Sequence, residues 1–324
     1  MVERRRFLGG LLSALSVSKG RADVTSPLKF LVVADVHYRP GVFPHDNVEW
    51  LDRILERAKD EQVDFCLQLG DFVHAARRDK AFLSHWLDFS IPTYSVLGNH
   101  DDDGGPHAET LEAFHLTRGY YSFDVKGVRF VVLDTNYACL EGRFVHYGTE
   151  LGRPSWKIPR GCGMRLHPDE LPWLEDQLFQ ASGPCVVCAH RRLNGEDSDA
   201  KAVQSILAQV NARYPGRVGL VLNGHHHCDQ LIRKDGISWY TVNSPNHCWV
   251  PIRHKAYPVE DVKRWKEIDH IVAYDTPVSA VLTKTASGYD VKGMQGSFWR
   301  GVTSGRAGCS PTITPHIQNR TIEI

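Results

Sequence analysis

Five short segments rich in aspartate, asparagine and histidine follow one another in a fixed order along this chain of 324 residues. Each stands at the end of an apolar run, where a buried strand is predicted to finish. The segments are Asp35-Val-His37, Gly70-Asp71, Gly98-Asn99-His100-Asp101, His190 and Gly224-His225-His226-His227. Carboxylate, amide and imidazole groups are common ligands of divalent metals, so strand ends carrying them predict one shared metal site.

The spacing inside the segments favours ligands on one side of the backbone. Residues two apart in an extended chain point the same way, so His225 and His227 should face the metal while His226 points away. A site with two metals needs a bridging carboxylate, and Asp71 is placed for that task. Glycines precede three of the segments and allow sharp turns close to the metals: Gly70, Gly98 and Gly224.

The elements that must position these residues alternate between strand and helix. Apolar runs predict strands at 30–34, 65–69 and 93–97. Helical spacing predicts helices between them, at 47–62 and near 79–88. Open α/β sheets place their sites at the carboxyl ends of the strands, which is where the metal-ligating segments stand.

The second half changes from parallel to antiparallel pairing. Residues 120–125 and 128–134 alternate around Lys126-Gly127, which predicts a hairpin. The stretch 136–167 has little periodicity and is too long for a plain connection, so we expect it to cover the substrate. Further helices and strands are predicted at 168–181, 185–189, 199–214, 218–222, near 231, and at 239–242, 271–274, 278–283 and 289–292. Together these elements predict two packed sheets with helices outside.

The five segments resemble the signature of the calcineurin-like metallophosphoesterase superfamily: D-x-H, G-D, G-N-H-[DE], H and G-H-x-H. The resemblance spans roughly residues 30–228. It implies an α/β fold, a four-layer α-β-β-α sandwich with two mixed sheets flanked by helices. It also implies two divalent metals bridged by Asp71, the first held by Asp35, His37 and His227 and the second by Asn99, His190 and His225.

The chemistry that the resemblance implies is hydrolysis at phosphorus. A hydroxide bridging the metals would attack in line with the leaving group, and His100 would protonate the leaving oxygen or stabilise the transition state. Asp101 is placed to orient His100. The ligand set suits manganese, iron or zinc without choosing among them.

Five further residues are candidates for contact with the substrate. Purple acid phosphatases carry a tyrosine three residues after the bridging aspartate, but this chain has His74 there, either as a partner of a metal ligand or as a substrate contact. Arg191 and Arg192 directly follow a predicted ligand and could bind phosphate through their guanidinium groups, or lie solvated on the surface. Asn246 and His247 follow the last segment, where the chain could return to the cleft.

Flanking segments such as Tyr120-Tyr-Ser-Phe-Asp124 and Leu171-Pro-Trp-Leu174 extend the resemblance to bacterial phosphoesterases related to the manganese-dependent ADP-ribose/CDP-alcohol diphosphatases. They imply a small phosphate ester or a nucleotide-like diphosphate as substrate. Class III cyclic nucleotide phosphodiesterases share the five motifs, so hydrolysis of a 3',5'-cyclic nucleotide is the alternative. A degenerate binding protein is disfavoured because such proteins usually lack ligands, and here all are present.

The charge balance disfavours a nuclease. The chain has 38 basic and 38 acidic residues, of which residues 1–22 hold five basic and one acidic, leaving 33 against 37. A mildly acidic protein lacks the basic surface expected for binding nucleic acid, so no nucleic-acid partner is expected.

The first 22 residues resemble a twin-arginine export signal. Glu3-Arg4-Arg5-Arg6-Phe7-Leu8 carries two arginines, any residue, then Phe-Leu; a mostly apolar stretch follows, and Ala22 is a small residue suited to cleavage. That stretch is too short for a stable membrane anchor, although a plain basic tail would look similar. We therefore expect a signal peptide over 1–22, a catalytic domain over 23–324, transit through the twin-arginine machinery, and a periplasmic or extracellular location.

Overall fold

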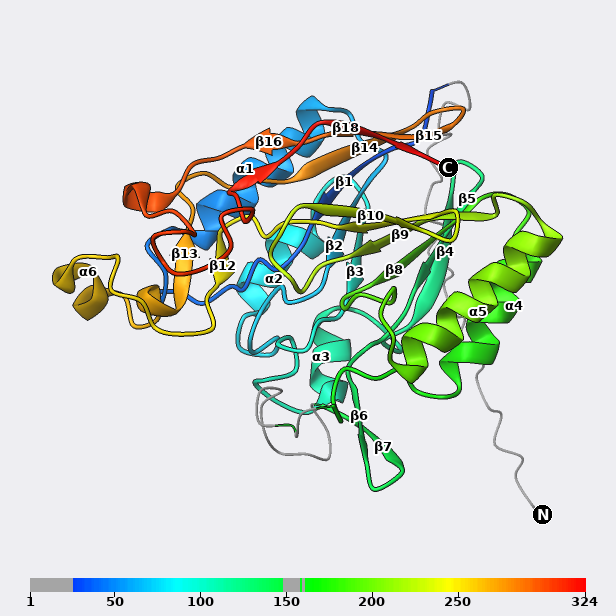
Figure 1. The fold of residues 1–324 in the computed structure, drawn as a ribbon, viewed down its shortest axis with the longest axis horizontal. Helices are drawn as coiled ribbons and strands as arrows, with labels where there is room; N and C mark the ends of the chain where they lie inside the picture. The colour runs from blue at the N-terminus through cyan, green and yellow to red at the C-terminus, as the bar shows by residue number, and fades with distance from the viewer. Residues whose placement is uncertain (1–25, 148–157, 159–160) are drawn as a thin grey trace, which may run out of the picture.

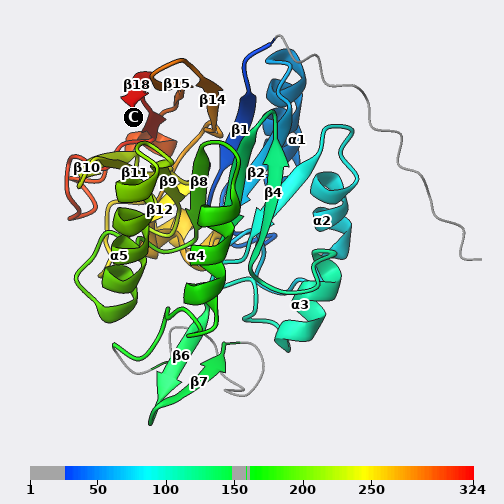
Figure 2. The same ribbon diagram turned by 90° about the vertical axis from the view of Figure 1, so that its right-hand side faces the viewer.

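The fold is centred on two six-stranded sheets that pack face to face (Figures 1 and 2). The structure is a computed structural model that describes residues 26–147, 158 and 161–324. Helices cover the outer face of each sheet, which gives four layers, α-β-β-α. The predicted fold class is confirmed, with both sheets mixed.

The first sheet has the strand order β18-β15-β14-β1-β2-β3. Three neighbouring strands pair in parallel: β1 (Lys29–Val33), β2 (Phe65–Leu69) and β3 (Thr93–Val96). The later strands add antiparallel at the edge of β1: β14 (Ala280–Lys284), β15 (Gly288–Lys292) and β18 (Arg320–Glu323). The sheet is therefore assembled from both ends of the chain.

The second sheet has the strand order β10-β11-β9-β8-β5-β4. Its antiparallel edges are the predicted hairpin β4 (Tyr121–Val125) and β5 (Val128–Val132), and β10 (Gln230–Lys234) paired with β11 (Ile237–Thr241). Between them β8 (Cys185–Ala189) and β9 (Val218–Asn223) run parallel. The continuous apolar runs of β8 and β9 are buried on both faces, as parallel strands covered by helices require.

The helices present one apolar side to their sheet. In α1 (Asn47–Asp60) the Asp46 side chain accepts the N–H groups of Val48 and Glu49 and caps the first turn. The buried residues of α1 recur at helical spacing and pack on the first sheet with α2 (Lys80–Leu87) and α3 (His107–Ala113). The second sheet is covered by α4 (Glu170–Gln180) and α5 (Ser198–Arg213).

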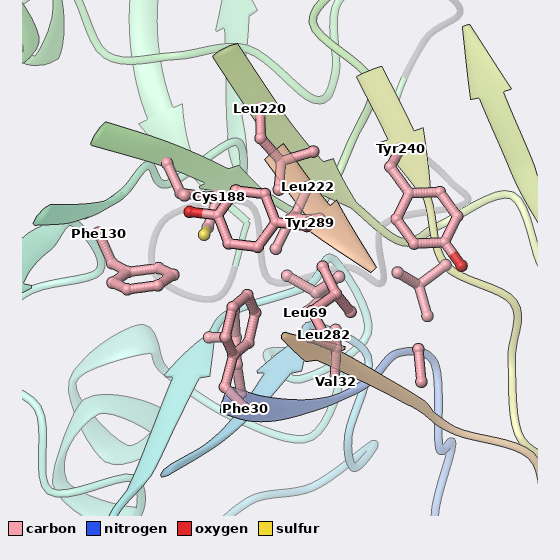
Figure 3. Packing of buried hydrophobic residues seen from close by; sticks show 14 of the residues in the cluster. Phe30, Val32, Leu69, Phe130, Cys188, Leu220, Leu222, Tyr240, Leu282 and Tyr289 are labelled. Carbon is pink, nitrogen blue, oxygen red and sulfur yellow. The ribbon is translucent and has the colours of Figure 1, made fainter. Parts of the chain in front are cut away.

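A large apolar core fills the space between the sheets (Figure 3). Phe30 of β1 stacks on Phe65 of β2, with ring centroids 4.9 Å apart, and its edge meets Phe130 of β5 across the sandwich. These ring contacts pack the two sheets against each other, which helps to position the strand ends that carry the candidate site.

Several short elements are absent from the sequence prediction. They are the hairpin β6 (Tyr137–Leu140) and β7 (Arg143–His146), β12 (His247–Trp249), α6 (Val259–Arg264), η2 (Ile268–His270), β16 (Met294–Gln295), η3 (Trp299–Gly301) and β17 (His316–Ile317), together with α3 and β18. In contrast, β13 (Ile271–Ala273) lies within the predicted strand 271–274. The β6–β7 turn places Glu141 at a positive φ of 51°, where glutamate gives no turn signal.

The hairpin lies inside the stretch 136–167 and extends away from the sheets (Figure 1). Part of the predicted substrate-covering loop lies outside the described residues. The predicted signal peptide lies entirely outside them. Among the described residues, no helix is long and apolar enough to span a membrane.

Candidate metal centre

All five sequence segments meet at the carboxyl ends of the central strands. Asp35 follows β1, Asp71 follows β2, the 98–101 segment follows β3, His190 follows β8 and His225 follows β9. These positions belong to both sheets, so the site spans the top of the sandwich. The sequence prediction of one shared location is therefore correct.

The spacing of the ligands predicted an extended backbone for these segments. In the structure the backbone at several of them is not extended. Five of the candidate ligands have a positive φ: Asp35 (56°), His37 (46°), Asp71 (54°), His225 (68°) and His227 (46°). Non-glycine residues rarely adopt this left-handed conformation, and they gather at functional sites. As a result His225 and His227 reach two different groups of ligands, while the exposed His226 joins neither.

Two clusters of metal-ligand atoms, buried except for the half-buried His225, share Asp71. One contains Asp35, His37 and Asp71, and the other contains Asp71, His190 and His225. In the first, His37 Nε2 lies 3.6 Å from Asp71 Oδ2 and 3.1 Å from His227 Nε2. In the second, His190 Nε2 lies 3.1 Å from Asp71 Oδ2 and 3.3 Å from His225 Nδ1. Because Asp71 belongs to both clusters, its carboxylate stands where a bridge between two cations is needed.

The hydrogen bonds of two imidazoles show that their other ring nitrogens are suited to bind cations. His190 Nδ1 donates to the carbonyl of Leu69 (2.8 Å), and His227 Nδ1 donates to the carbonyl of His247 (2.8 Å). A carbonyl only accepts, so in the neutral rings the lone pairs lie on Nε2, the atoms that enter the clusters. Lone pairs facing other imidazoles and carboxylates repel one another unless a cation lies between them, which is the usual arrangement around metal-bound histidine.

The pKa shifts of the side chains in the two clusters are consistent with a site that binds cations. Burial lowers the pKa of His37 and of His225 well below the ordinary value, which favours their neutral, metal-binding forms. Burial also lowers the pKa of His190, but the Asp71 carboxylate outweighs it and raises the value to about 9. Although burial opposes ionisation of Asp71, His190 and His100 hold its pKa well below the usual range.

Two positions require glycine because the side chains of candidate ligands lie close to the backbone there. A Cβ at Gly98 would lie 2.2 Å from the Asp71 side chain, and one at Gly70, whose φ is +97°, would lie 2.4 Å from the His190 ring. The expectation that glycine brings the backbone close to the centre is therefore confirmed at these positions. Asn99 is buried in the same loop, where the N–H of His100 donates to Asp71 Oδ1 (2.8 Å).

Asp101 does not orient His100, which corrects the sequence-based expectation. Its carboxylate accepts four backbone N–H groups, from Asp71, Phe72, Val73 and Gly98, at 2.7 to 3.0 Å. Burial and then the Asp71 carboxylate raise the pKa of Asp101 to about 8, and cations at the centre would favour the ionised form. Asp101 thus fixes the backbone that carries Asp71.

The partner of His100 is Asp103. His100 Nδ1 lies 2.5 Å from Asp103 Oδ2, and the two residues close a turn in which the N–H of Asp103 donates to the carbonyl of His100. Neighbouring side chains in such a turn point apart, whereas the residue three positions on returns to the first. The run Asp101-Asp-Asp103 offered this partner in the sequence, but its residue types do not distinguish the three carboxylates.

His74 lies between the centre and Asp103. Its Nε2 is 2.8 Å from His37 Nδ1, and its Nδ1 is 3.7 Å from Asp103 Oδ2. Of the two alternatives left open by the sequence, this contact favours a partner of a metal ligand. His37, His74, Asp103 and His100 form a continuous series of polar contacts from the centre to the candidate proton donor.

The other candidate substrate contacts are engaged within the chain. Arg191 pairs with Asp197 at 3.0 Å, and Arg192 donates to Thr241 Oγ1 at 2.9 Å. Asn246 Nδ2 donates to the carbonyl of Val36. Contact of these three side chains with substrate stays a prediction.

His247 lies closer to the centre than the sequence suggested. Its backbone holds His227, and its fully buried ring forms a further possible ligand group with His37 and His227. Burial lowers the pKa of His247 well below its ordinary value, which favours the neutral ring. An isolated histidine at the start of a three-residue strand gave no metal signal in the sequence.

A four-layer sandwich in which two Asp/His clusters share one carboxylate defines a metallophosphoesterase. Residues 28–229 match the family described as calcineurin-like phosphoesterase, and the chain belongs to that family. The family is named for phosphoester hydrolysis, and the Asp/His clusters of this chain are of a kind that could hold metal ions.

The chain is also similar to named relatives and to a solved structure. The chain is 32% identical to the serine/threonine-protein phosphatase CPPED1 of Rattus norvegicus, and 39% identical to that of Mus musculus, each over 157 residues, or 41% of this chain and 50% of the relative. The chain thus spans about half the length of these curated relatives. A dimetal phosphatase from Danio rerio shares the fold, with a TM-score of 0.58 at 16% identity over 92% of this chain and 99% of that one.

Proposed function

We propose that this chain hydrolyses phosphate monoesters at a dinuclear centre whose two cations would share Asp71 as a ligand. Asp35, His37 and His227 would hold one cation, and Asn99, His190 and His225 the other. The observation that carries the proposal is the membership of Asp71 in both clusters. Two bound divalent cations supply Lewis acidity, which activates water and neutralises charge on the phosphoryl group.

His100 is the proposed proton donor to the leaving oxygen. Burial lowers its pKa, but the carboxylates of Asp71 and Asp103 raise it above the ordinary value, so the ring can carry a proton. Its side chain keeps 20% of its surface exposed, in contrast to the fully buried His190. A partly accessible, protonated imidazole beside the centre suits donation to an ester oxygen.

The relatives support a monoester as substrate, because they are named serine/threonine-protein phosphatases. The flanking motifs favour a second candidate, a nucleotide-like diphosphate, with 3',5'-cyclic nucleotides as a further possibility. All of these require attack at phosphorus and differ only in the leaving group. The phosphate-bearing part of the substrate is what this centre recognises.

A small substrate panel tests the proposal. Protein loaded with manganese, iron or zinc should release phosphate from p-nitrophenyl phosphate and a phosphoserine peptide, and chelation should abolish turnover. Faster release of nucleoside monophosphate from ADP-ribose would favour a nucleotide-like diphosphate over the monoester as substrate, and faster release from cyclic AMP would favour a cyclic nucleotide. No turnover of any of these phosphoesters with any of the three metals would refute the enzyme's proposed function.

Asp103 should act as a positioning residue for His100. An Asp103→Asn substitution removes the charge that holds the ring at 2.5 Å, and we expect kcat to fall about 10- to 100-fold with metal content unchanged. The fall should be larger for an alkyl phosphate than for p-nitrophenyl phosphate, because only the poor leaving group needs a proton. An equal fall for both substrates would contradict this assignment, and Asp60→Asn on the exposed side of α1 serves as control.

We also propose that residues 1–22 direct export through the twin-arginine machinery into the periplasm or beyond. The support is the order of arginine pair, apolar stretch and small residues. Replacing Arg4 and Arg5 together by lysine should retain the protein in the cytoplasm of a bacterial host, as measured by cell fractionation. Unchanged export of the double variant would argue for another route.

A further inference from the structure

A second group of side chains that could hold a metal ion lies outside the proposed dinuclear centre, where the start of α3 meets the end of β7 (Figure 1). It consists of Asp102, from the loop after β3, His107, the first residue of α3, and His146, the last residue of β7. None of the three takes part in the proposed hydrolysis. Their ligand atoms all lie within 4.8 Å of one another.

The distances in this group match those of the dinuclear centre. His107 Nδ1 lies 3.2 Å from Asp102 Oδ1, and His146 Nδ1 lies 3.4 Å from Asp102 Oδ2. Around the shared Asp71 the corresponding distances are 3.1 and 3.6 Å. Two ligands bound about 2.0 to 2.1 Å from one tetrahedral zinc ion stand roughly 3.3 Å apart, so the same spacing suits a cation here.

The carboxylate of Asp102 is buried and points into the group. Asp102 is only 4% exposed, and among the described residues no hydrogen bond reaches its Oδ2. Its ion-pair contacts in the described part of the chain are with the two imidazoles. A buried carboxylate without a permanent positive partner is costly, and a cation held by the three side chains would supply that charge.

A second carboxylate prepares His146 to bind a metal. His146 Nε2 donates to Asp134 Oδ2 at 3.1 Å, and Asp134 Oδ1 in turn accepts the N–H of Asn136 at 3.0 Å. In the neutral ring this bond leaves the lone pair on Nδ1, the atom that faces Asp102. A histidine held by a carboxylate on one nitrogen and facing a metal with the other is a recurrent arrangement at zinc sites.

The imidazole rings contribute to the same geometry. His107 and His146 stack with ring centroids 3.4 Å apart, which places both Nδ1 atoms at the Asp102 carboxylate. Two nitrogens and one carboxylate oxygen form a three-ligand set of the kind that binds zinc with one position left for water.

We propose that Asp102, His107 and His146 bind a divalent cation of the zinc type, separate from the dinuclear centre. The cation joins the β6–β7 hairpin to the loop that carries His100. Since Asp102 stands between Asp101, which holds the Asp71 backbone, and Asp103, which holds His100, the bound cation would fix the position of both neighbours. The cation would therefore influence the proposed hydrolysis only through the positions of Asp101 and Asp103.

Metal content and position test the site together. The zinc content of four zinc-loaded, desalted proteins is measured by mass spectrometry. They are the wild type, His107→Ala, His107→Gln and the control His115→Ala; His115 is exposed and lies just after α3. We expect about one zinc ion fewer in both His107 variants than in the wild type and the control, with an unchanged circular dichroism spectrum. Equal zinc in all four proteins would overturn the proposal.

Anomalous scattering from zinc-soaked crystals locates the ions. A peak between Asp102, His107 and His146, in addition to those at Asp71, supports the proposal. Peaks at the dinuclear centre alone would overturn it and leave the proposed hydrolysis unaffected, so the two ideas fail independently.

Discussion

Replacing His100 by asparagine is expected to lower kcat about 10²- to 10⁴-fold while the protein keeps its metals, because general acid catalysis typically contributes that much. The ligand clusters do not depend on the His100 ring, and the backbone N–H that donates to Asp71 is retained in the variant. The loss should be greater for an alkyl phosphate than for p-nitrophenyl phosphate, whose leaving group departs without a proton. Steady-state kinetics with both substrates, together with metal analysis, measure the effect.

The matched control for this variant is His115→Asn. His115 is exposed and has a φ of 56°, a left-handed conformation that asparagine tolerates, so activity should stay unchanged. A His100→Asn protein that loses its metals, or that loses activity equally on both substrates, would show that His100 supports the centre rather than donating a proton.

Replacing Asp101 by asparagine is expected to lower the free energy of unfolding by about 3 to 5 kcal/mol. Both carboxylate oxygens of Asp101 accept two backbone N–H groups each, and an amide NH₂ in either orientation would face two of these donors without accepting them. Each buried donor left without an acceptor costs about 1 to 3 kcal/mol. Urea denaturation of the metal-loaded protein measures the loss, which Asp60→Asn on the exposed side of α1 should not show.

The same substitution should also weaken metal binding. The four donors belong to Gly98 and to the 71–73 backbone, so their displacement would move the Asp71 carboxylate. Wild-type stability together with wild-type metal affinity would mean that Asp101 is not the anchor of this loop.

The long elements were predictable because each carries its own pattern. The apolar runs of β2 and β8 are buried along their whole length, and α1 shows one apolar side and a capping aspartate. Short elements such as β6, β7 and α6 contain too few residues to show a periodic signal. The structure also contains one edge built from β15 and β18, whose pairing joins residues 288–291 to the chain's final strand, a long-range choice that local pattern does not encode.

The sequence predicted which residues meet at the site, but it did not predict the direction of every side chain. The order of the five segments indicated which residues meet at the strand ends, but the extended backbone assumed for His225 and His227 is a left-handed one. Side-chain direction inside a turn depends on local φ and ψ, which the letters do not specify. For that reason Asp101 was given the position that Asp103 holds, and His107 and His146, distant in sequence, were not connected at all.

Three consecutive aspartates serve three different neighbours: Asp101 the backbone of Asp71, Asp102 the imidazoles of His107 and His146, and Asp103 the ring of His100. Each carboxylate can be replaced separately, with a separate loss. A deletion or insertion of one residue in this run leaves its composition almost unchanged, yet it turns every carboxylate toward its neighbour's partner. The length of this turn is therefore under a stricter constraint than the identity of any one of its residues.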